Sequence, residues 1–259
     1  MRFLKLLAAA AGVALVPAAA QAGTVAALTG EATLAIIDTD TLKVTRSVTV
    51  TGAGGPLLGI DVRPADGALY GLVADGTVVT IDWTTGAATR KSKLEKMPPA
   101  GATVTVDFNP VADRLRVIGS DGTNLRANVE DGKVVTDGAL KFGDADTNKG
   151  KAPKVVAGSY TNSVKGATQT TLYDIDATTG VLVKQAPPND GVLGTVGSLG
   201  MPVTMVAFDI GPDGKGGDAG WLLADGTLYS VDLASGKTTK VGAVAGVTKA
   251  WDIAVIPAK

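Results

Sequence analysis

The feature that most constrains this chain is an internal repeat of short β-strands and tight turns. A unit that opens with Asp-Gly-Thr and closes on a Gly turn occupies residues 75–86 and returns at 225–236. Weaker copies lie at residues 171–180, 121–132 and 32–43. Each copy predicts a strand, a turn opened by an Asp or Asn side chain, and a returning strand. We therefore expect an all-β fold.

A second repeated unit gives the number of blades. Its copies lie at residues 59–64, 105–110, 157–162, 207–212 and 250–255, and their third positions are 46, 52, 50 and 43 residues apart. Four-stranded propeller blades repeat at roughly 40–50 residues. The first turn unit has no such strand before it and the last strand has no turn unit after it, so the two ends complete one blade. We predict a five-bladed β-propeller closed by pairing of N- and C-terminal strands, with a β-sandwich or an open solenoid as alternatives.

The start of the chain has the pattern of a cleavable signal peptide. Arg2 and Lys5 precede an apolar run, and small residues ending at Ala22 form a cleavage motif before Gly23. We therefore expect residues 23–259 to form one propeller domain that is periplasmic or secreted. No later stretch is long and apolar enough to span a membrane, and 24 basic against 25 acidic side chains give no basic surface for nucleic acid. We expect a monomer.

The absence of His and Cys limits the chemistry. It excludes Ser-His-Asp hydrolysis, zinc sites with nitrogen or sulfur ligands, His-ligated haem and disulfides. Any reaction would have to use carboxylates, Lys, Tyr, Ser or Thr side chains, or a hard metal ion.

Four of the five inner-strand units carry an Asp at the same position. These channel carboxylates are Asp61, Asp107, Asp209 and Asp252. A ring of carboxylates around a central channel can bind a hard cation or serve acid–base chemistry. The structural interpretation is favoured, because a repeated Asp commonly accepts hydrogen bonds from backbone amides in a turn of the next blade.

The second blade departs from the repeat. Its returning strand carries Asn124, Arg126 and Asn128 on one face, and the strand before it carries Arg114 and Arg116. Buried guanidinium groups need partners, and their planar fork suits a carboxylate. Two hypotheses stay open: ion pairs with a neighbouring blade, or a site, to which Asn109 of the same blade would also belong, for a bound anion or sugar acid.

Residues 144–150 resemble the start of a calcium-binding loop. Asp144, Asp146 and Asn148 place oxygen ligands at alternating positions. The loop departs from the EF-hand pattern because Gly150 stands at position seven and Val155 at position twelve. Calcium is therefore a possible cofactor, and an ordinary polar loop is the alternative.

Several segments resemble a bacterial family of domains of unknown function, numbered 4394. They are residues 106–110, 113–117, 124–126, 143–144, 159–162, 172–176 and 185–191. The resemblance covers nearly the whole mature chain, and Pro188-Asn189-Asp190-Gly191 is its most specific part. It implies an exported propeller-like domain and supplies no catalytic residues. Ala186 stands where the family pattern has Asn.

Two functions compete on these grounds, and a structural role at the cell surface or in an extracellular matrix is a third alternative. The first is an exported, non-catalytic scaffold that binds a protein, a glycan or a small anionic ligand, although the aromatic content of 4% argues against a strong carbohydrate platform. The alternative is a calcium-assisted hydrolase of lactonase or glycosidase type that uses the channel residues Asp61, Asp107, Asn109 and Asp209. We expect binding rather than catalysis, because no Glu lies in the inner-strand unit and no His is available as a base.

Overall fold

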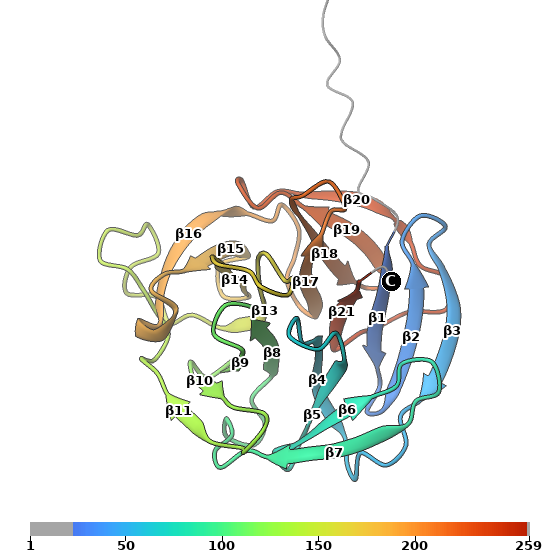
Figure 1. Cartoon of the computed structure of the whole chain (residues 1–259). Helices are drawn as coiled ribbons and strands as arrows, with labels where there is room; N and C mark the ends of the chain where they lie inside the picture. The colour runs from blue at the N-terminus through green and yellow to red at the C-terminus, as the bar shows by residue number, and fades with distance from the viewer. Residues whose placement is uncertain (1–22, 258–259) are drawn as a thin grey trace, which may run out of the picture.

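The computed structural model describes residues 23–257, and these form five sheets, antiparallel except for one short strand, around a common centre (Figure 1). The innermost strands are β4 (Leu57–Val62), β8 (Val104–Asn109), β13 (Val155–Tyr160), β17 (Val206–Pro212) and β21 (Asp252–Ile256). The second strands are β5 (Leu69–Val73), β9 (Arg114–Gly119), β14 (Leu172–Asp176), β18 (Asp218–Ala224) and β1 (Thr24–Thr29). The third strands are β6 (Thr77–Ile81), β10 (Asn124–Ala127), β15 (Val181–Gln185), β19 (Thr227–Val231) and β2 (Thr33–Asp38). The outermost strands are β7 (Ala88–Lys93), β11 (Val134–Thr136), β16 (Val192–Ser198), β20 (Thr238–Ala243) and β3 (Lys43–Thr49). The predicted five-bladed propeller is confirmed.

The predicted ring closure is also confirmed. The last strand, β21, pairs with β1 in antiparallel register from Leu28 opposite Asp252 to Thr24 opposite Ile256. The fifth blade therefore takes its inner strand from the C-terminal end and its other three from the N-terminal end. This pairing leaves no open sheet edge at the seam. The predicted signal peptide lies outside the described residues, and no helix in the described part is long and apolar enough to cross a membrane.

Burial falls from the centre to the rim. The inner strand β8 is buried along five of its six residues, whereas the outer strand β7 has only half-buried and exposed residues. The core consists of apolar clusters between neighbouring blades, because both faces of an inner strand are covered. This explains why the inner strands carry Val, Ile, Leu and Phe while the outer strands carry Thr, Ser, Lys and Arg.

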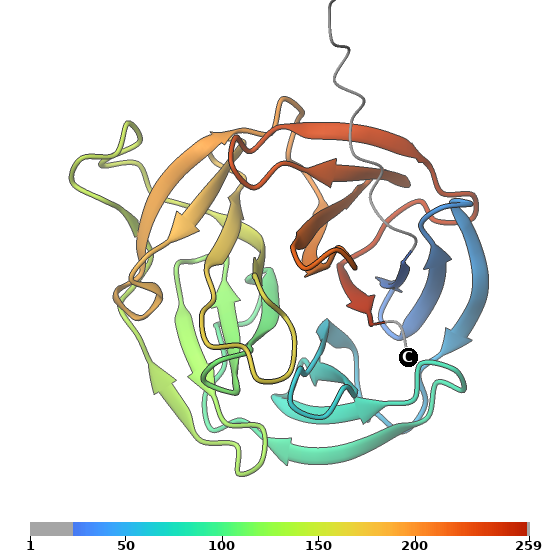
Figure 2. The ribbon, with the colours of Figure 1, turned by 45° about the horizontal axis from the view of Figure 1, so that its top comes forward.

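The outer strands follow one another around the rim (Figure 2). The amide of Thr51, just after β3, donates to the carbonyl of Gly86 at 2.9 Å, and Ala88 at the start of β7 donates back to Thr51 at 2.8 Å. Gly86 has a φ of +80°, and a Cβ there would collide with the carbonyl oxygen of Thr49. Glycine is therefore required where the turn of one blade touches the outer strand of the blade before it.

The third blade departs from the expected repeat. The turn unit at residues 171–180 spans β14, the second strand, whereas the other copies span third strands. Asp176 accepts the amide and hydroxyl of Thr179, so the same turn chemistry serves a different turn. This blade also gains β12 (Lys141–Phe142), which runs parallel to β16, and a short 3-10 helix, η1 (Pro188–Asp190).

Candidate functional site

One position of each inner strand faces the next blade, and its hydrogen bonds identify it. Inner strands are sheet edges, so their buried amides need acceptors from outside the sheet. The side chain at this position accepts a hydrogen bond from a backbone amide in the inner strand of the following blade. That amide belongs to the residue directly after the equivalent position of that strand. The bonds are Phe108 N to Asp61 Oδ2 (2.6 Å), Tyr160 N to Asp107 Oδ1 (2.9 Å), Ile210 N to Ser159 Oγ (3.0 Å) and Val255 N to Asp209 Oδ2 (2.6 Å).

This pattern corrects the sequence alignment of the fifth blade. Because Asp209 binds the amide of Val255, the corresponding residue in β21 is Ala254, and Asp252 lies two residues earlier. Asp252 accepts the amide of Ile60 at 2.9 Å, and its carboxylate occupies the space beside Gly59. A shift of two residues keeps a side chain on the same face of a strand, so alternation alone could not reveal it.

The ring therefore consists of Asp61, Asp107, Ser159, Asp209 and Ala254. Since Ala254 offers no oxygen, the amide of Val62 donates instead to Asp61 Oδ1 at 2.6 Å. The acceptor role that we expected for the repeated Asp side chains is present, although they bind strand amides rather than turn amides. These bonds hold each blade against the next.

Three carboxylates of the ring converge. One oxygen each of Asp61, Asp107 and Asp209 lies within 4.8 Å of the other two, and all three residues are buried. No Lys or Arg in the described part of the chain forms an ion pair with them. Burial, and then repulsion from neighbouring carboxylates, raises the pKa of Asp61 and of Asp107 well above the ordinary value. Burial likewise raises the pKa of Asp209. The group lacks positive charge, and carboxylate oxygens are the ligands that hard cations prefer.

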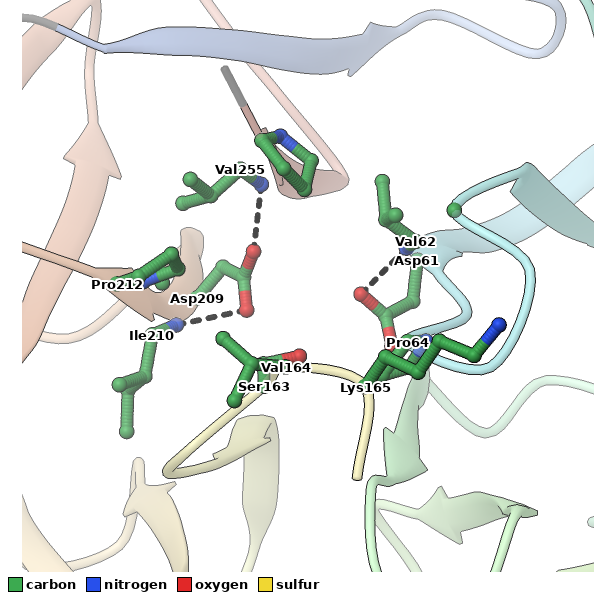
Figure 3. Close-up of a pocket in the computed structure, with 13 residues that line it drawn as sticks. Asp61, Val62, Pro64, Ser163, Val164, Lys165, Asp209, Ile210, Pro212 and Val255 are labelled. Carbon is green, nitrogen blue, oxygen red and sulfur yellow. Dashed lines mark hydrogen bonds between the residues drawn. The ribbon is translucent and has the colours of Figure 1, made fainter. Parts of the chain in front are cut away.

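A cavity of about 240 Å³ opens over this group at the end of the channel where the inner strands finish (Figure 3). Asp61 and Asp209 line it from opposite blades, and Lys165 lies at its rim on the loop between β13 and β14. Its other walls are mainly apolar, formed by Val62, Pro64, Val164, Ile210, Pro212, Val255 and Pro257. A small ligand entering here meets carboxylates at one end and hydrocarbon on its sides.

The arginine residues of the second blade are held by protein groups. Arg116 is 2% exposed and donates to Tyr160 Oη (3.1 Å), Asn124 Oδ1 (2.9 Å), Asp137 Oδ2 (2.6 Å) and Asn189 Oδ1 (2.9 Å). Arg126 forms a bidentate pair with the same Asp137, at 2.6 and 2.9 Å. The partner carboxylate thus comes from the same blade, just after β11, and not from a neighbouring blade as one hypothesis held. Tyr160 and Asn189 of the third blade complete the network across the interface.

The other predicted ligand-binding residues are spread apart. Arg114 is exposed and donates to the backbone carbonyl of Asp113 at 2.8 Å. Asn109 accepts the amides of Val111 and Ala112, and Asn128 accepts the amide of Glu130, so both stabilise turns. These contacts give no convergent anion site.

Sequence reasoning missed two buried side chains at the same interface. Asp174 and Gln185 are 0% and 1% exposed, and within the described residues neither oxygen of Asp174 nor Oε1 of Gln185 has a hydrogen-bond partner. Burial raises the pKa of Asp174 to about 8, while Arg116 acts in the opposite direction. Gly158, directly opposite Asp174 in β13, leaves space for the carboxylate. The only signal in the sequence is an Asp at a strand position that alternation assigns to the interior.

The candidate calcium ligands are already engaged. Asp144 projects into solvent and pairs with Lys149 at 3.1 Å. Asp146 accepts the amide of Asn148 at 2.7 Å and the hydroxyl of Thr195 at 2.9 Å. Asn148 Oδ1 accepts from Lys151 Nζ at 2.9 Å. A calcium ion would have to displace an ammonium group, so this geometry lends the prediction no support.

Comparisons with known proteins agree with the fold. No curated protein matches the chain. A protein of unknown function from Bacteroides thetaiotaomicron is 18% identical over 92% of this chain and 62% of its own, with a TM-score of 0.55; this chain spans less than two thirds of that protein. A chain in a nidogen–laminin complex is 11% identical over 92% of this chain and 99% of its own, with a TM-score of 0.53. At these identities the similarity shows the propeller fold alone.

The sequence profile of a domain of unknown function, DUF4394, matches residues 33–254, which reach from the third strand of the fifth blade around the ring to its inner strand. With more than four fifths of the chain matched, and with the fold that the resemblance implied, this propeller belongs to the DUF4394 family.

Proposed function

We propose that this protein is an exported, non-catalytic binding scaffold whose site is the cavity over Asp61 and Asp209, and that its ligand carries a positively charged group. The observation that carries the proposal is the convergence of three buried carboxylates that no cation of the described chain neutralises. A small organic ammonium would place its charge against Asp61 and Asp209, the two of these carboxylates that line the cavity, and its hydrocarbon part against the apolar walls. An anionic ligand on the second blade loses its support, because protein acceptors already hold the guanidinium of Arg116 and because Asp137 forms ion pairs with both Arg116 and Arg126.

The test compares ligands of opposite charge and a rim variant that leaves the fold intact. We expect calorimetry to detect binding of ethanolamine and choline but not of acetate. Lys165 is exposed and forms no ion pair with the residues that the structure describes, so Lys165→Glu should fold normally and tighten ammonium binding roughly three- to tenfold at low salt. Lys249→Glu makes the same charge change on a loop outside the cavity and should leave binding unchanged. Equal effects of the two variants, or no binding of either ammonium, would refute the proposal.

The second candidate is a calcium-assisted hydrolase of lactonase or glycosidase type. It is favoured by the same three oxygens, which lie close enough together to share one metal ion. Asp107 separates the two candidates, because it belongs to the converging group but does not line the cavity. Asp107→Ala should abolish calcium binding while sparing an ammonium ligand. Calcium-dependent cleavage of δ-valerolactone or of nitrophenyl glycosides, lost in that variant, would establish the hydrolase instead.

A further inference from the structure

The opposite mouth of the channel is built from the first residues of the inner strands. The corrected alignment places five residues at corresponding positions three residues before the ring: Leu58, Val104, Val156, Val206 and Trp251. Four are aliphatic, of which Val104 and Val206 are buried and the other two half-buried. Trp251, in contrast, is 47% exposed and is the one aromatic among the large exposed apolar side chains of the described residues. Its own amide is fixed to the carbonyl of Leu28 at 2.8 Å, so the backbone beneath the indole is anchored.

Trp251 stands between two hollows. One of about 320 Å³ extends from the fifth blade over the first to the second, and one of about 360 Å³ from the second over the third to the fourth. Trp251 and Thr103 line both, so the two hollows adjoin at these residues, and together they are called the depression. Each lobe is within the size range of small-ligand sites, roughly 300–1,000 Å³. This depression is separate from the cavity over Asp61, at the other end of the inner strands.

The polar groups at the edge of the depression are balanced. Glu31 lines one lobe and Lys154 the other, and both are exposed and in no ion pair within the described part of the chain. Thr103 and Thr204 add hydroxyl groups. With one carboxylate, one ammonium and two hydroxyls, the edge offers both acceptors and donors but no net charge. It therefore matches a neutral ligand rich in groups that both donate and accept hydrogen bonds.

We propose that this depression binds a neutral oligosaccharide of at least two linked sugar rings. A pyranose ring presents an apolar C–H face, which covers the flat indole of Trp251, and hydroxyl groups around its edge, which reach Glu31, Lys154 and the threonines. The rings on either side of the stacked one occupy the two lobes. An aromatic ligand would use the indole but not the polar edge, and an ionic ligand would meet a charge of each sign.

The experiment uses the indole as its own reporter. Cellotetraose, maltotetraose and tetra-N-acetylchitotetraose are titrated up to about 10 mM, a range that detects even weak sites, while Trp fluorescence is recorded. We expect at least one to give a saturable blue shift, because the ligand removes Trp251 from water. Trp251→Ala should abolish the shift and weaken binding by at least about tenfold, and Trp251→Phe should retain part of the affinity by calorimetry.

Two controls keep the result decisive. Trp83→Phe alters a tryptophan outside the depression and should leave binding unchanged. Glu31→Gln, on the exposed turn between β1 and β2, should weaken saccharide binding without affecting folding. The proposal is overturned if no saccharide saturates, if binding survives Trp251→Ala, or if an aromatic probe such as caffeine binds in place of the sugars. Because the ammonium site lies elsewhere, Lys165→Glu should not alter saccharide binding, and either proposal can fail alone.

Discussion

Replacing Asp174 by Asn should make the protein more stable at neutral and alkaline pH. Asp174 is fully buried, neither of its oxygens has a partner in the described part of the chain, and its pKa is raised to about 8 from 3.8. Between these two values the unfolded chain has released the proton while the folded chain still holds it. Because the unfolded state then binds fewer protons, stability falls as the pH rises from about 4 to about 8, and above that the cost is constant.

The size of this effect follows from the displacement of the pKa. One pKa unit corresponds to about 1.4 kcal/mol, so the full cost above pH 8 is on the order of 6 kcal/mol. Asparagine has nearly the same shape and no charge, and it can donate as well as accept. Asp174→Asn should therefore gain several kcal/mol over the wild type at pH 8.5 and little at pH 4.5.

Urea unfolding of both proteins at half-unit steps from pH 4.5 to 9 measures this difference. Asp61, Asp107, Asp209 and Asp252 also have raised pKa values, but they are present in both proteins, so the difference between the two curves isolates Asp174. Exposed Asp40→Asn serves as the control and should give parallel curves. A stability difference between wild type and Asp174→Asn that does not change with pH would refute the reasoning.

Three further perturbations test the packing of the blades. Arg116→Leu should lower the free energy of unfolding in urea by about 3–5 kcal/mol, because it leaves the buried Asp137 with one guanidinium fewer. Arg114→Leu is the control and should change this free energy by less than about 0.5 kcal/mol. Equal effects of the two variants would contradict the network around Arg116. Gly86→Ala should lower the free energy of unfolding by about 1–2 kcal/mol or more, and with it the thermal midpoint, since it adds a Cβ at positive φ against the neighbouring blade. An unchanged midpoint would show that the blades are not in contact there. Calorimetry of Asp146→Ala with calcium chloride should match the wild type, because the Asp146 loop is occupied by protein donors; calcium heat lost in this variant would establish the loop site instead.

The sequence predicted the architecture well because two independent repeats carried it. Spacing alone gave five blades, and the unmatched unit at each end gave the closure. The turn-forming Asp series was equally accessible, since Asp82 accepts the amide of Thr84 at 2.8 Å through a contact two residues long. Local contacts of this kind need no knowledge of the fold. The unit at residues 171–180 shows the limit, because the same local turn can join the second and third strands as readily as the third and fourth.

The partners of the second-blade arginines were beyond sequence reasoning for a physical reason. Asp137 follows β11 in a stretch that does not repeat, and Asn189 comes from the third blade, 73 residues beyond Arg116. Charge alone predicted that a carboxylate was needed but not which one. The family segment around residues 185–191 has a visible role here, since it delivers Asn189 and the carbonyl of Pro188 to the second blade.

The fifth blade shows how a small error in register can conceal a site. Period-two alternation fixes which face a side chain occupies but not its height along the strand, so Asp252 took the place that belongs to Ala254. With that alignment the channel has four equivalent carboxylates, and Trp251 corresponds to the buried residues Ile60, Val106 and Phe208. The hydrogen bond from Val255 to Asp209 moves the strand by two residues. Asp252 then leaves the converging group, and Trp251 falls into line with Leu58, Val104, Val156 and Val206. One correction thus defines both ends of the channel: a group of carboxylates that lacks a cation at one mouth, and a single exposed indole in an aliphatic ring at the other.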